Sequence, residues 1–456
     1  MRREEYLHIL TEQIRCKMAR ATIEQEINDH IEDQKAEFLG EGMGQTEAEE
    51  AAIREMGDPV EVGLEMDRIH RPTMAWGMIA LIVGLSLAGY LLRSIMYQTA
   101  GKTEELFWAG MSSSWHTSLE LPVLLLGLVL MIGICYMDYT RIAVYAKPIL
   151  IAYQVLLFIG LQVAGAKMYG TTRYIIMPFG NIVLNLIDLL WLTIPLFAAV
   201  LYSYRGQGYR GILKAILWMI IPSYFLIIRC QSLIAAMILE VVYCVVLAAA
   251  VYKGWFQVCK KAVLTGIGVV VVLIPVLLAG GIWCFGMAYQ KERIAAIFSI
   301  GDYAVDFPRV NVIREMISGS SAFHGNPQFK ELLTYVDGRV HLLASVVAAY
   351  GILAGILLVL CLVVLILRFA KISLNQKNQL GMVMGTGCTA LFLIQAIVFI
   401  LENLGGVGEM GIYCPFLGTE RSGILASYIL LGLLLSICRY QKTAPEPVIR
   451  KKNVPG

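Results

Sequence analysis

The chain has 456 residues, of which 58% are hydrophobic, and its formal net charge is +3. The mean hydropathy of +0.68 is well above what a soluble domain needs to cover a single core, so most of the length must face lipid or other helices. A soluble globular enzyme is thereby excluded, and we expect no nucleic-acid partner.

Charge divides the chain into unequal parts. Residues 1–73 contain 18 Asp and Glu against 9 Lys and Arg, a net charge of −9, which leaves +12 for the remainder. We therefore predict an acidic cytoplasmic domain at 1–72, a membrane domain at 73–440 and a basic cytoplasmic tail at 441–456. The ten cysteines form no CxxC pair, which excludes a zinc ribbon and a disulfide framework. No cleavable signal is expected, since the first apolar stretch starts only near Met74.

The acidic segment predicts a bundle of three or four short helices. Each predicted start pairs an N-cap residue with a partner three residues later: Thr22 with Gln25, Thr46 with Glu49, and Asp58 with Glu61. The residues predicted to face the core of this bundle are Ile23, Ile27, Ile31 and Phe38 in the second helix, and Met56, Val60, Leu64 and Ile69 in the helices after it.

Residues 23–43 and 47–63 of this segment resemble the permease-prefix (HAAS-like) domains of bacterial membrane proteins. The resemblance implies an adaptor or regulatory module with no chemistry of its own. Glu26, His30 and Asp33 share one helical face, but the acidic residues around them indicate a solvated surface. We assign no metal site.

Ten apolar stretches follow the acidic segment, and the fold class is therefore an all-α bundle of about ten transmembrane helices. Each stretch is close to the ~20 residues that a hydrocarbon core of about 30 Å requires. The predicted spans are 74–97, 121–137, 148–166, 184–204, 212–228, 231–252, 262–288, 341–367, 380–401 and 422–438.

Basic residues between these spans fix the expected orientation. They occupy alternate loops, at Arg141 and Lys147, at Arg205, Arg210 and Lys214, at Lys253, Lys260 and Lys261, at Arg368, Lys371 and Lys377, and in the tail from Arg439. By the positive-inside rule, both termini are expected in the cytoplasm of a bacterium, with the chain in its inner membrane. The longest connection, 289–340, is then external.

Two features of the membrane domain point to an anionic ligand, and each also has a plainer interpretation. The external loop contains Lys291, Arg293 and Arg339, which suit a lipid diphosphate or ordinary solvation beside the membrane. Asp188 and Glu240 lie inside apolar spans, where they line a headgroup cavity or form a buried structural pair such as Glu240 with an arginine.

Short motifs along the membrane domain then indicate a family. They are Asp138 to Arg141, Gly170 with Arg173, Tyr174 and Ile175, Tyr289 and Gln290 with Arg293 and Ile294, Gly411 to Phe416, and Leu431 to Ile437. With them, residues 74–440 resemble the SEDS family of FtsW, RodA and SpoVE-like cell cycle proteins, which implies ten spans with both ends inside.

The resemblance implies a function in peptidoglycan synthesis during cell division, cell shape or sporulation. It implies a lipid-linked peptidoglycan precursor as the substrate, with Arg173, Lys291, Arg293, Arg339, Asp188 and Glu240 as candidate binding residues. The expected partner is a class B penicillin-binding transpeptidase or another membrane protein of the division or elongation machinery. No cofactor is expected, although an active enzyme is compatible with a divalent cation.

The family's essential external aspartate aligns with Val340, which cannot exchange a proton. Asp337, three residues earlier, is the candidate catalytic substitute, close to one helical turn away if a helix begins there. Two alternatives stay open beside a glycosyltransferase: a non-catalytic scaffold or regulator of envelope synthesis, and a transporter. The transporter has only the buried carboxylates and the prefix-like segment in its favour, and the chain contains no ATP-binding motif.

Overall fold

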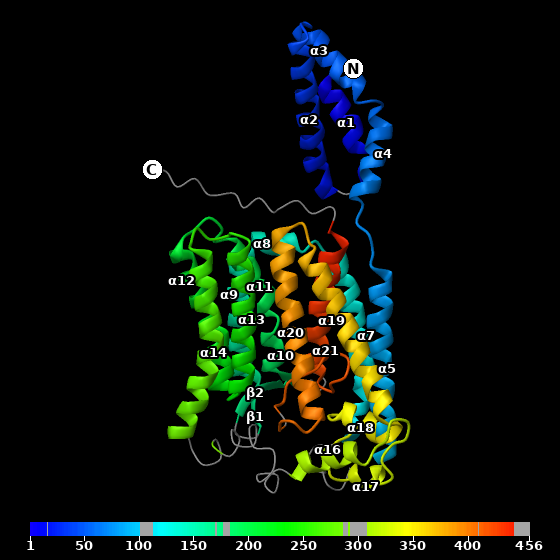
Figure 1. Cartoon of the computed structure of the whole chain (residues 1–456), viewed down its shortest axis with the longest axis vertical. Helices are drawn as coiled ribbons and strands as arrows, with labels where there is room; N and C mark the ends of the chain where they lie inside the picture. Colours follow the sequence, from blue (N-terminus) through cyan, green and yellow to red (C-terminus); the bar gives the residue numbers. More distant parts are fainter. Residues whose placement is uncertain are drawn as a thin grey trace.

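A computed structural model describes residues 1–15, 17–100, 113–168, 171–176, 183–285, 291, 308–408 and 410–441. Within these residues a small bundle of four helices is followed by a larger bundle of long apolar helices (Figure 1). Each has its own hydrophobic cluster, and the two clusters share no residue.

The small bundle consists of α1 (Arg3–Glu12), α2 (Lys17–Gly40), α3 (Gln45–Glu55) and α4 (Pro59–His70). Its core contains the predicted α2 residues Ile23, Ile27 and Ile31, which are almost fully buried. The Asp58 cap is confirmed, because its carboxylate accepts a hydrogen bond from the Val60 N–H at 3.1 Å. The starts predicted at Thr22 and Thr46 are wrong, since α2 and α3 begin at Lys17 and Gln45.

The predicted inward face of α4 is also wrong. Val60, Leu64 and Ile69 are 37%, 51% and 52% exposed, whereas Gly63 and Asp67 face α1. A Cβ at Gly63 would lie only 2.7 Å from the Leu10 carbonyl oxygen, so α4 approaches α1 through a position without a side chain. Asp67 accepts a hydrogen bond from the backbone N–H of Arg15 at 2.8 Å, and this bond turns the polar residue inward.

The larger bundle confirms the predicted membrane architecture. Its long helices are α5 (Trp76–Ala100), α7 (Ser113–Tyr136), α9 (Ala146–Ala164), α12 (Tyr209–Tyr224) with the π-turn η1 (Phe225–Arg229), α13 (Leu233–Tyr252), α14 (Lys260–Phe285), α19 (Ile352–Leu374), α20 (Gln379–Asn403) and α21 (Arg421–Arg439). Among the described residues, 8 helices are long and apolar enough to cross a membrane, and the other two predicted spans correspond to the shorter apolar helices Glu120–Tyr136 and Leu186–Tyr202.

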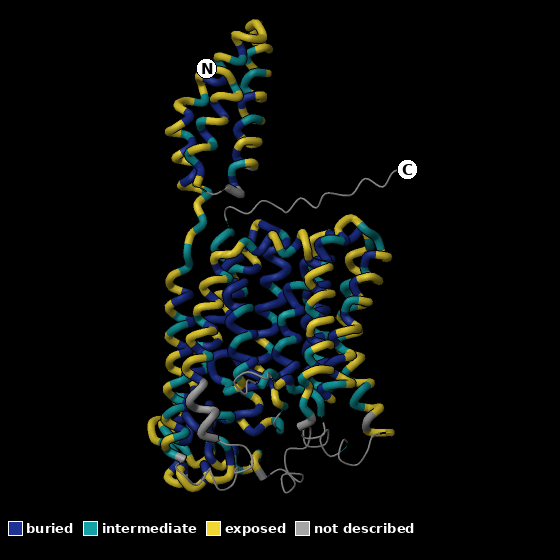
Figure 2. The backbone as a smooth tube through the Cα atoms, turned by 180° about the vertical axis from the view of Figure 1, so that it is seen from behind, coloured by how far each residue is buried: buried dark blue, intermediate teal, exposed yellow. Residues whose placement is uncertain are grey.

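The centre of this bundle is formed by α20 and α21, whose membrane-spanning residues are mostly buried (Figure 2). Helix α21 packs along α7, and α20 packs against α11 (Thr193–Tyr202), α13 and α19. By contrast, none of the described residues in the apolar window of α14 is buried. Helix α5 begins and α21 ends at the same end of the bundle, which we call the proximal end (Figure 1).

The opposite, distal end carries short elements that the sequence did not predict. A three-stranded antiparallel sheet, β1 (Gly165–Met168), β2 (Thr171–Ile176) and β3 (Val183–Asn185), follows α9. Tyr174 pairs with both Ala166 and Asn185 across this sheet. The chain then enters α10 (Leu186–Leu190), where the Asn185 side chain accepts from the Ile187 N–H at 3.1 Å. The remaining short helices are α8 (Thr140–Val144), which lies at the proximal end, and α16 (Pro308–Ser318), α17 (Phe329–Leu332) and α18 (Leu342–Tyr350) at the distal end (Figure 1).

The eighth predicted span, 341–367, is two helices rather than one. Helix α18 ends before Gly351, which has a φ of +96°, and the membrane-crossing helix α19 runs from Ile352 to Leu374. The Asn326 N–H donates to the Ala348 carbonyl at 2.8 Å, and the Ile352 N–H donates to the Ser321 carbonyl at 3.0 Å. This loop therefore binds the ends of both helices, and α18 stays at the distal end.

Candidate functional site

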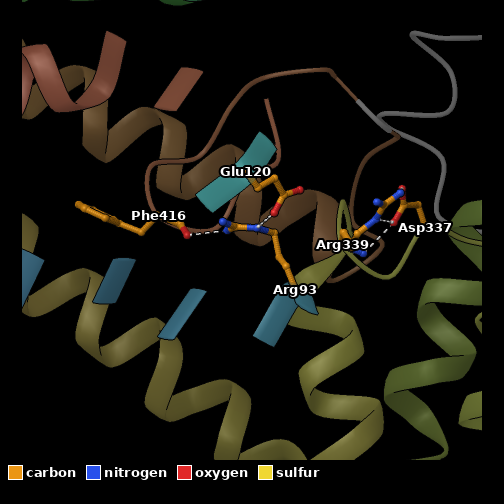
Figure 3. A network of polar contacts seen from close by, with 5 residues as sticks. All are labelled: Arg93, Glu120, Asp337, Arg339 and Phe416. Atoms are coloured by element: carbon orange, nitrogen blue, oxygen red, sulfur yellow. Dashed lines mark hydrogen bonds and ion pairs between the residues drawn. The ribbon is translucent and has the colours of Figure 1, made fainter. Parts of the chain in front are cut away.

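A buried ion pair joins α5 and α7 at the distal end. Arg93 Nε lies 3.5 Å from Glu120 Oε2, and the two side chains are 3% and 7% exposed. The Arg93 Nη1 atom also donates a hydrogen bond to the Phe416 carbonyl at 2.8 Å (Figure 3). The guanidinium therefore neutralises a buried carboxylate and also binds the loop that precedes α21.

The loop around Phe416 lies close to its neighbours at three glycines, where there is no side chain to prevent the contact. Phe416 has a left-handed φ of +70°, and its carbonyl oxygen would be 2.1 Å from a Cβ at Gly89, one helical turn before Arg93. The ring of Tyr413 in the same loop packs where Cβ atoms of Gly418 and Gly423 would stand. Glycines on α5, in the loop and on α21 thus let the backbone of this loop lie against the helices.

A second carboxylate and arginine lie beside the first pair. Arg339 holds Asp337 in a two-pronged contact, with Nε at 3.1 Å from Oδ1 and Nη2 at 2.9 Å from Oδ2. The Arg339 guanidinium also lies 5.3 Å from the centre of the Tyr97 ring of α5. The charges of Asp337 and Arg339 act on Glu120, and Figure 3 shows the two pairs as neighbours. We call Arg93, Glu120, Asp337 and Arg339 the distal charge cluster.

Val340, the position of the expected aspartate, lies in the turn that directly precedes α18. The N–H groups of Val340 and His341 donate to the Asp337 carbonyl at 3.1 and 3.0 Å. Asp337 therefore closes a turn ahead of α18, so no helix begins at this residue, which was the condition for placing it one helical turn from Val340. Its side chain is 24% exposed, so solvent still reaches the carboxylate.

The structure brings Arg173 and Asp188 into a second polar group, around the start of α10. Asp188 is 1% exposed and accepts a hydrogen bond from the Ser422 hydroxyl at 2.7 Å. The charges of Glu420 and Arg173 act on it. Arg173 donates a hydrogen bond to the Tyr174 hydroxyl at 2.7 Å. Burial raises the pKa of Tyr174, and the negative charge of Glu420 raises it further. The positive charge of Arg173 opposes both effects. Within the described contacts, Asp188 is thus a satisfied buried carboxylate.

The other candidate residues do not join either group. Glu240 accepts a hydrogen bond from the Ser223 hydroxyl, so the suggested arginine partner is replaced by a serine of α12 among the described contacts. Lys291 has a helical backbone and is partly exposed, while Arg293 lies outside the described residues. The parts of the chain that the structure describes contain no group of three metal-ligating side chains.

Arg93 and Glu120 are not among the site residues predicted from the sequence. A signal was present, because each is a lone charge within or directly beside a predicted apolar span, 74–97 and 121–137. Their pairing could not be predicted from the sequence, since the two residues meet only through the packing of α5 and α7.

Comparison with known proteins gives consistent results. The model of the FtsW/RodA/SpoVE cell cycle protein family matches residues 78–443. A probable peptidoglycan glycosyltransferase FtsW of Trichlorobacter lovleyi is 25% identical over 162 residues, which are 35% of this chain and 42% of that relative's length. The match therefore spans less than half of the curated relative.

Solved structures show the same fold. A chain of a peptidoglycan synthase complex, studied for its coordination of polymerization and crosslinking, superposes with a TM-score of 0.63 at 18% identity, covering 81% of this chain and 99% of that one. The rod shape determining protein RodA of Thermus thermophilus superposes with a TM-score of 0.54 at 16% identity, covering 81% and 98%.

Proposed function

The chain belongs to the FtsW/RodA/SpoVE family of cell cycle proteins, and on that premise we propose that it is a peptidoglycan glycosyltransferase-type membrane protein of cell shape or division. Its proposed substrate is a lipid-linked peptidoglycan precursor. The observation that carries this proposal is the distal charge cluster, in which a carboxylate and an arginine lie directly beside the position of the expected aspartate.

Glycan polymerisation of this type needs two groups. A base removes the proton from the attacking sugar hydroxyl, and cations neutralise the diphosphate that leaves the anomeric carbon. Asp337 is the proposed base and Arg339 the proposed cation. Both side chains are partly exposed, at 24% and 14%, whereas Glu120 is almost fully buried against Arg93. Glu120 and Arg93 are then positioning residues, which hold the loop around Phe416.

The closed contact between Asp337 and Arg339 suggests how the base is released. A diphosphate is a stronger bidentate acceptor for a guanidinium than one carboxylate, because it carries more charge and more oxygens. Binding of the precursor would draw Arg339 away from Asp337 and leave the carboxylate free to accept a proton. The base would thereby become available only when the leaving group is in place.

The wider setting is proposed on the same premise. We place the proximal end, with both termini, in the cytoplasm of a bacterium, supported by the basic residues in alternate loops. A class B penicillin-binding transpeptidase is the proposed partner, supported by the similarity to a chain from a synthase complex that couples polymerization to crosslinking. The small bundle is proposed to be an adaptor of the permease-prefix kind.

The test is polymerisation by the purified full chain with its transpeptidase and lipid-linked precursor. We expect glycan product from the natural chain, its loss in Asp337→Asn, and its retention in Glu331→Gln, a matched control at an exposed carboxylate of α17. Val340→Asp is expected to keep or raise activity, because it supplies the family's carboxylate. Absence of product under conditions where a catalytic relative works, or full activity of Asp337→Asn, would contradict the proposal.

A further inference from the structure

Two lysines converge on one tyrosine ring at the proximal end, far from the distal charge cluster. Lys147, in the first turn of α9, places its Nζ 4.3 Å from the centre of the Tyr204 ring. Lys214 of α12 places its Nζ 5.6 Å from the same centre. The two ammonium groups are near enough to repel each other, so this arrangement is unfavourable unless something compensates it.

The tyrosine beneath the lysines is buried and hydrogen-bonded. Tyr204 is 7% exposed, and its hydroxyl accepts a hydrogen bond from Trp218 Nε1 at 2.8 Å. The loop that carries Tyr204 is joined to the next proximal loop, because the Gly206 N–H donates to the Trp255 carbonyl at 2.7 Å and the Gln257 N–H donates to the Gln207 carbonyl at 2.9 Å. The ring that both lysines contact is therefore held in place by its surroundings.

No described contact joins either lysine to a carboxylate, and Asp138, in the loop that leads to α9, pairs with Arg141 at 3.8 Å. The chain has no Asp or Glu between Asp188 and Glu240 or between Glu240 and Glu292, so both proximal loops beside Tyr204 lack one. Lys214 donates to the Gln207 side chain at 3.2 Å, which is a neutral partner. Two cations beside one aromatic ring, with no acid in contact with either, produce a local positive potential that attracts an anion.

The helices that carry the lysines strengthen the positive potential. Helices α9 and α12 both begin at this point, their N-cap residues Tyr145 and Gly208 provide no side-chain cap, and neither first turn contains an acid. The positive ends of two helix dipoles therefore add to the two ammonium charges.

Below the lysines, both helices present apolar side chains to the surroundings of the bundle. Ile151 lies one turn after Lys147 on the same face of α9 and is 50% exposed. Leu217 and Ile221 lie one and two turns after Lys214 and are 56% and 43% exposed. A molecule with an anionic head group and apolar chains matches a surface that is cationic at the start of α9 and α12 and apolar further along both helices.

We propose that Lys147 and Lys214, over Tyr204, bind a phosphate group, and that an anionic phospholipid headgroup is its main source, with free phosphate the other. The acyl chains then lie along the exposed apolar faces of α9 and α12. This site is separate from the proposed polymerisation site and does not depend on catalysis.

The test titrates dioleoyl-phosphatidylglycerol, dioleoyl-phosphatidylcholine or inorganic phosphate into the purified full chain in detergent and measures the midpoint of thermal unfolding. We expect phosphatidylglycerol to raise the midpoint at lower concentration than phosphatidylcholine. Each lysine replaced by glutamine should weaken the apparent affinity about 5-fold, since one cation near a lipid surface contributes about that factor. If inorganic phosphate is as effective as phosphatidylglycerol, the free ion is the source.

Matched variants separate this site from a general effect of basic loops. Lys260→Gln/Lys261→Gln removes the same charge from the same end as Lys147→Gln/Lys214→Gln and should keep the affinity for phosphatidylglycerol. Lys214→Gln alone covers the case in which the double variant does not fold, because this side chain is exposed. Equal losses in the two double variants, no loss in Lys214→Gln, or no preference of the natural chain for any phosphate compound over phosphatidylcholine would overturn the proposal.

Discussion

Replacement of Gly89 by alanine tests how the loop before α21 is held. The new Cβ would lie 2.1 Å from the Phe416 carbonyl oxygen and 3.4 Å from Arg93 Nη1. The first contact is with backbone, which no side-chain rotation relieves, so the loop or α5 must move by more than 1 Å to restore an ordinary separation of about 3.5 Å. Such a movement breaks the 2.8 Å hydrogen bond from Arg93 to Phe416.

The magnitude follows from three effects. Overpacking costs about 1–3 kcal/mol, and loss of a hydrogen bond to a charged group costs about 1.5–3 kcal/mol. Alanine in place of glycine within a helix returns up to about 1 kcal/mol. We therefore expect Gly89→Ala to lower the free energy of unfolding by roughly 1.5–6 kcal/mol.

The assay is thermal unfolding of the purified protein, with Gly84→Ala as the control. Gly84 lies on the same helix, and a Cβ there would meet nothing within 4 Å. The control should match or exceed the natural chain in stability. If Gly89→Ala is as stable as Gly84→Ala, the loop is not held against α5 in the way described.

Three further predictions concern charges and caps. Arg93→Met leaves Glu120 buried without its cation and should lower the unfolding free energy by about 3–5 kcal/mol. The double variant Arg93→Met/Glu120→Met should recover most of this loss in the same thermal unfolding assay. Absence of recovery would contradict a direct pairing of the two side chains. In the small bundle, the hydrogen bond from Lys35 lowers the pKa of Glu49, so its stabilising effect is present above the ordinary value near 4.5 and disappears as the pH falls through the lowered value. Hydrogen exchange of α3 should show this loss, and Lys35→Met should remove the pH dependence. Asp58→Ala should cost about 1 kcal/mol, seen as faster exchange in α4 but not in α2.

Features that depend on local composition were predictable. The apolar spans, the Asp58 cap and the buried face of Ile23, Ile27 and Ile31 all follow from residues close together in the chain, because hydropathy, capping and helical periodicity act over one or two turns. The break at Gly351 was not predictable, since apolar residues continue on both sides of it. Only the docking of the loop around Asn326 shows where the helix stops.

The sequence also placed Asp337 and Arg339 in the candidate site, because they lie beside the position at which the family resemblance expects an acid. It could not show that the two side chains bind each other or that Glu120 lies next to them. Glu120 and Arg93 are on different helices, and a period of 3.6 residues gives the face of each helix but not the neighbour that it meets.

By itself, the sequence determined a polytopic helical membrane protein with an acidic bundle at its start and basic residues in alternate loops. Lipid imposes this much directly, since each span must satisfy its own backbone and cover its length with apolar side chains. The tertiary structure alone decided which charges meet. Arg93 reaches both Glu120 and a carbonyl 323 residues away in the chain, and Lys147 and Lys214 both reach the Tyr204 ring, because the packing of helices brings distant residues close together.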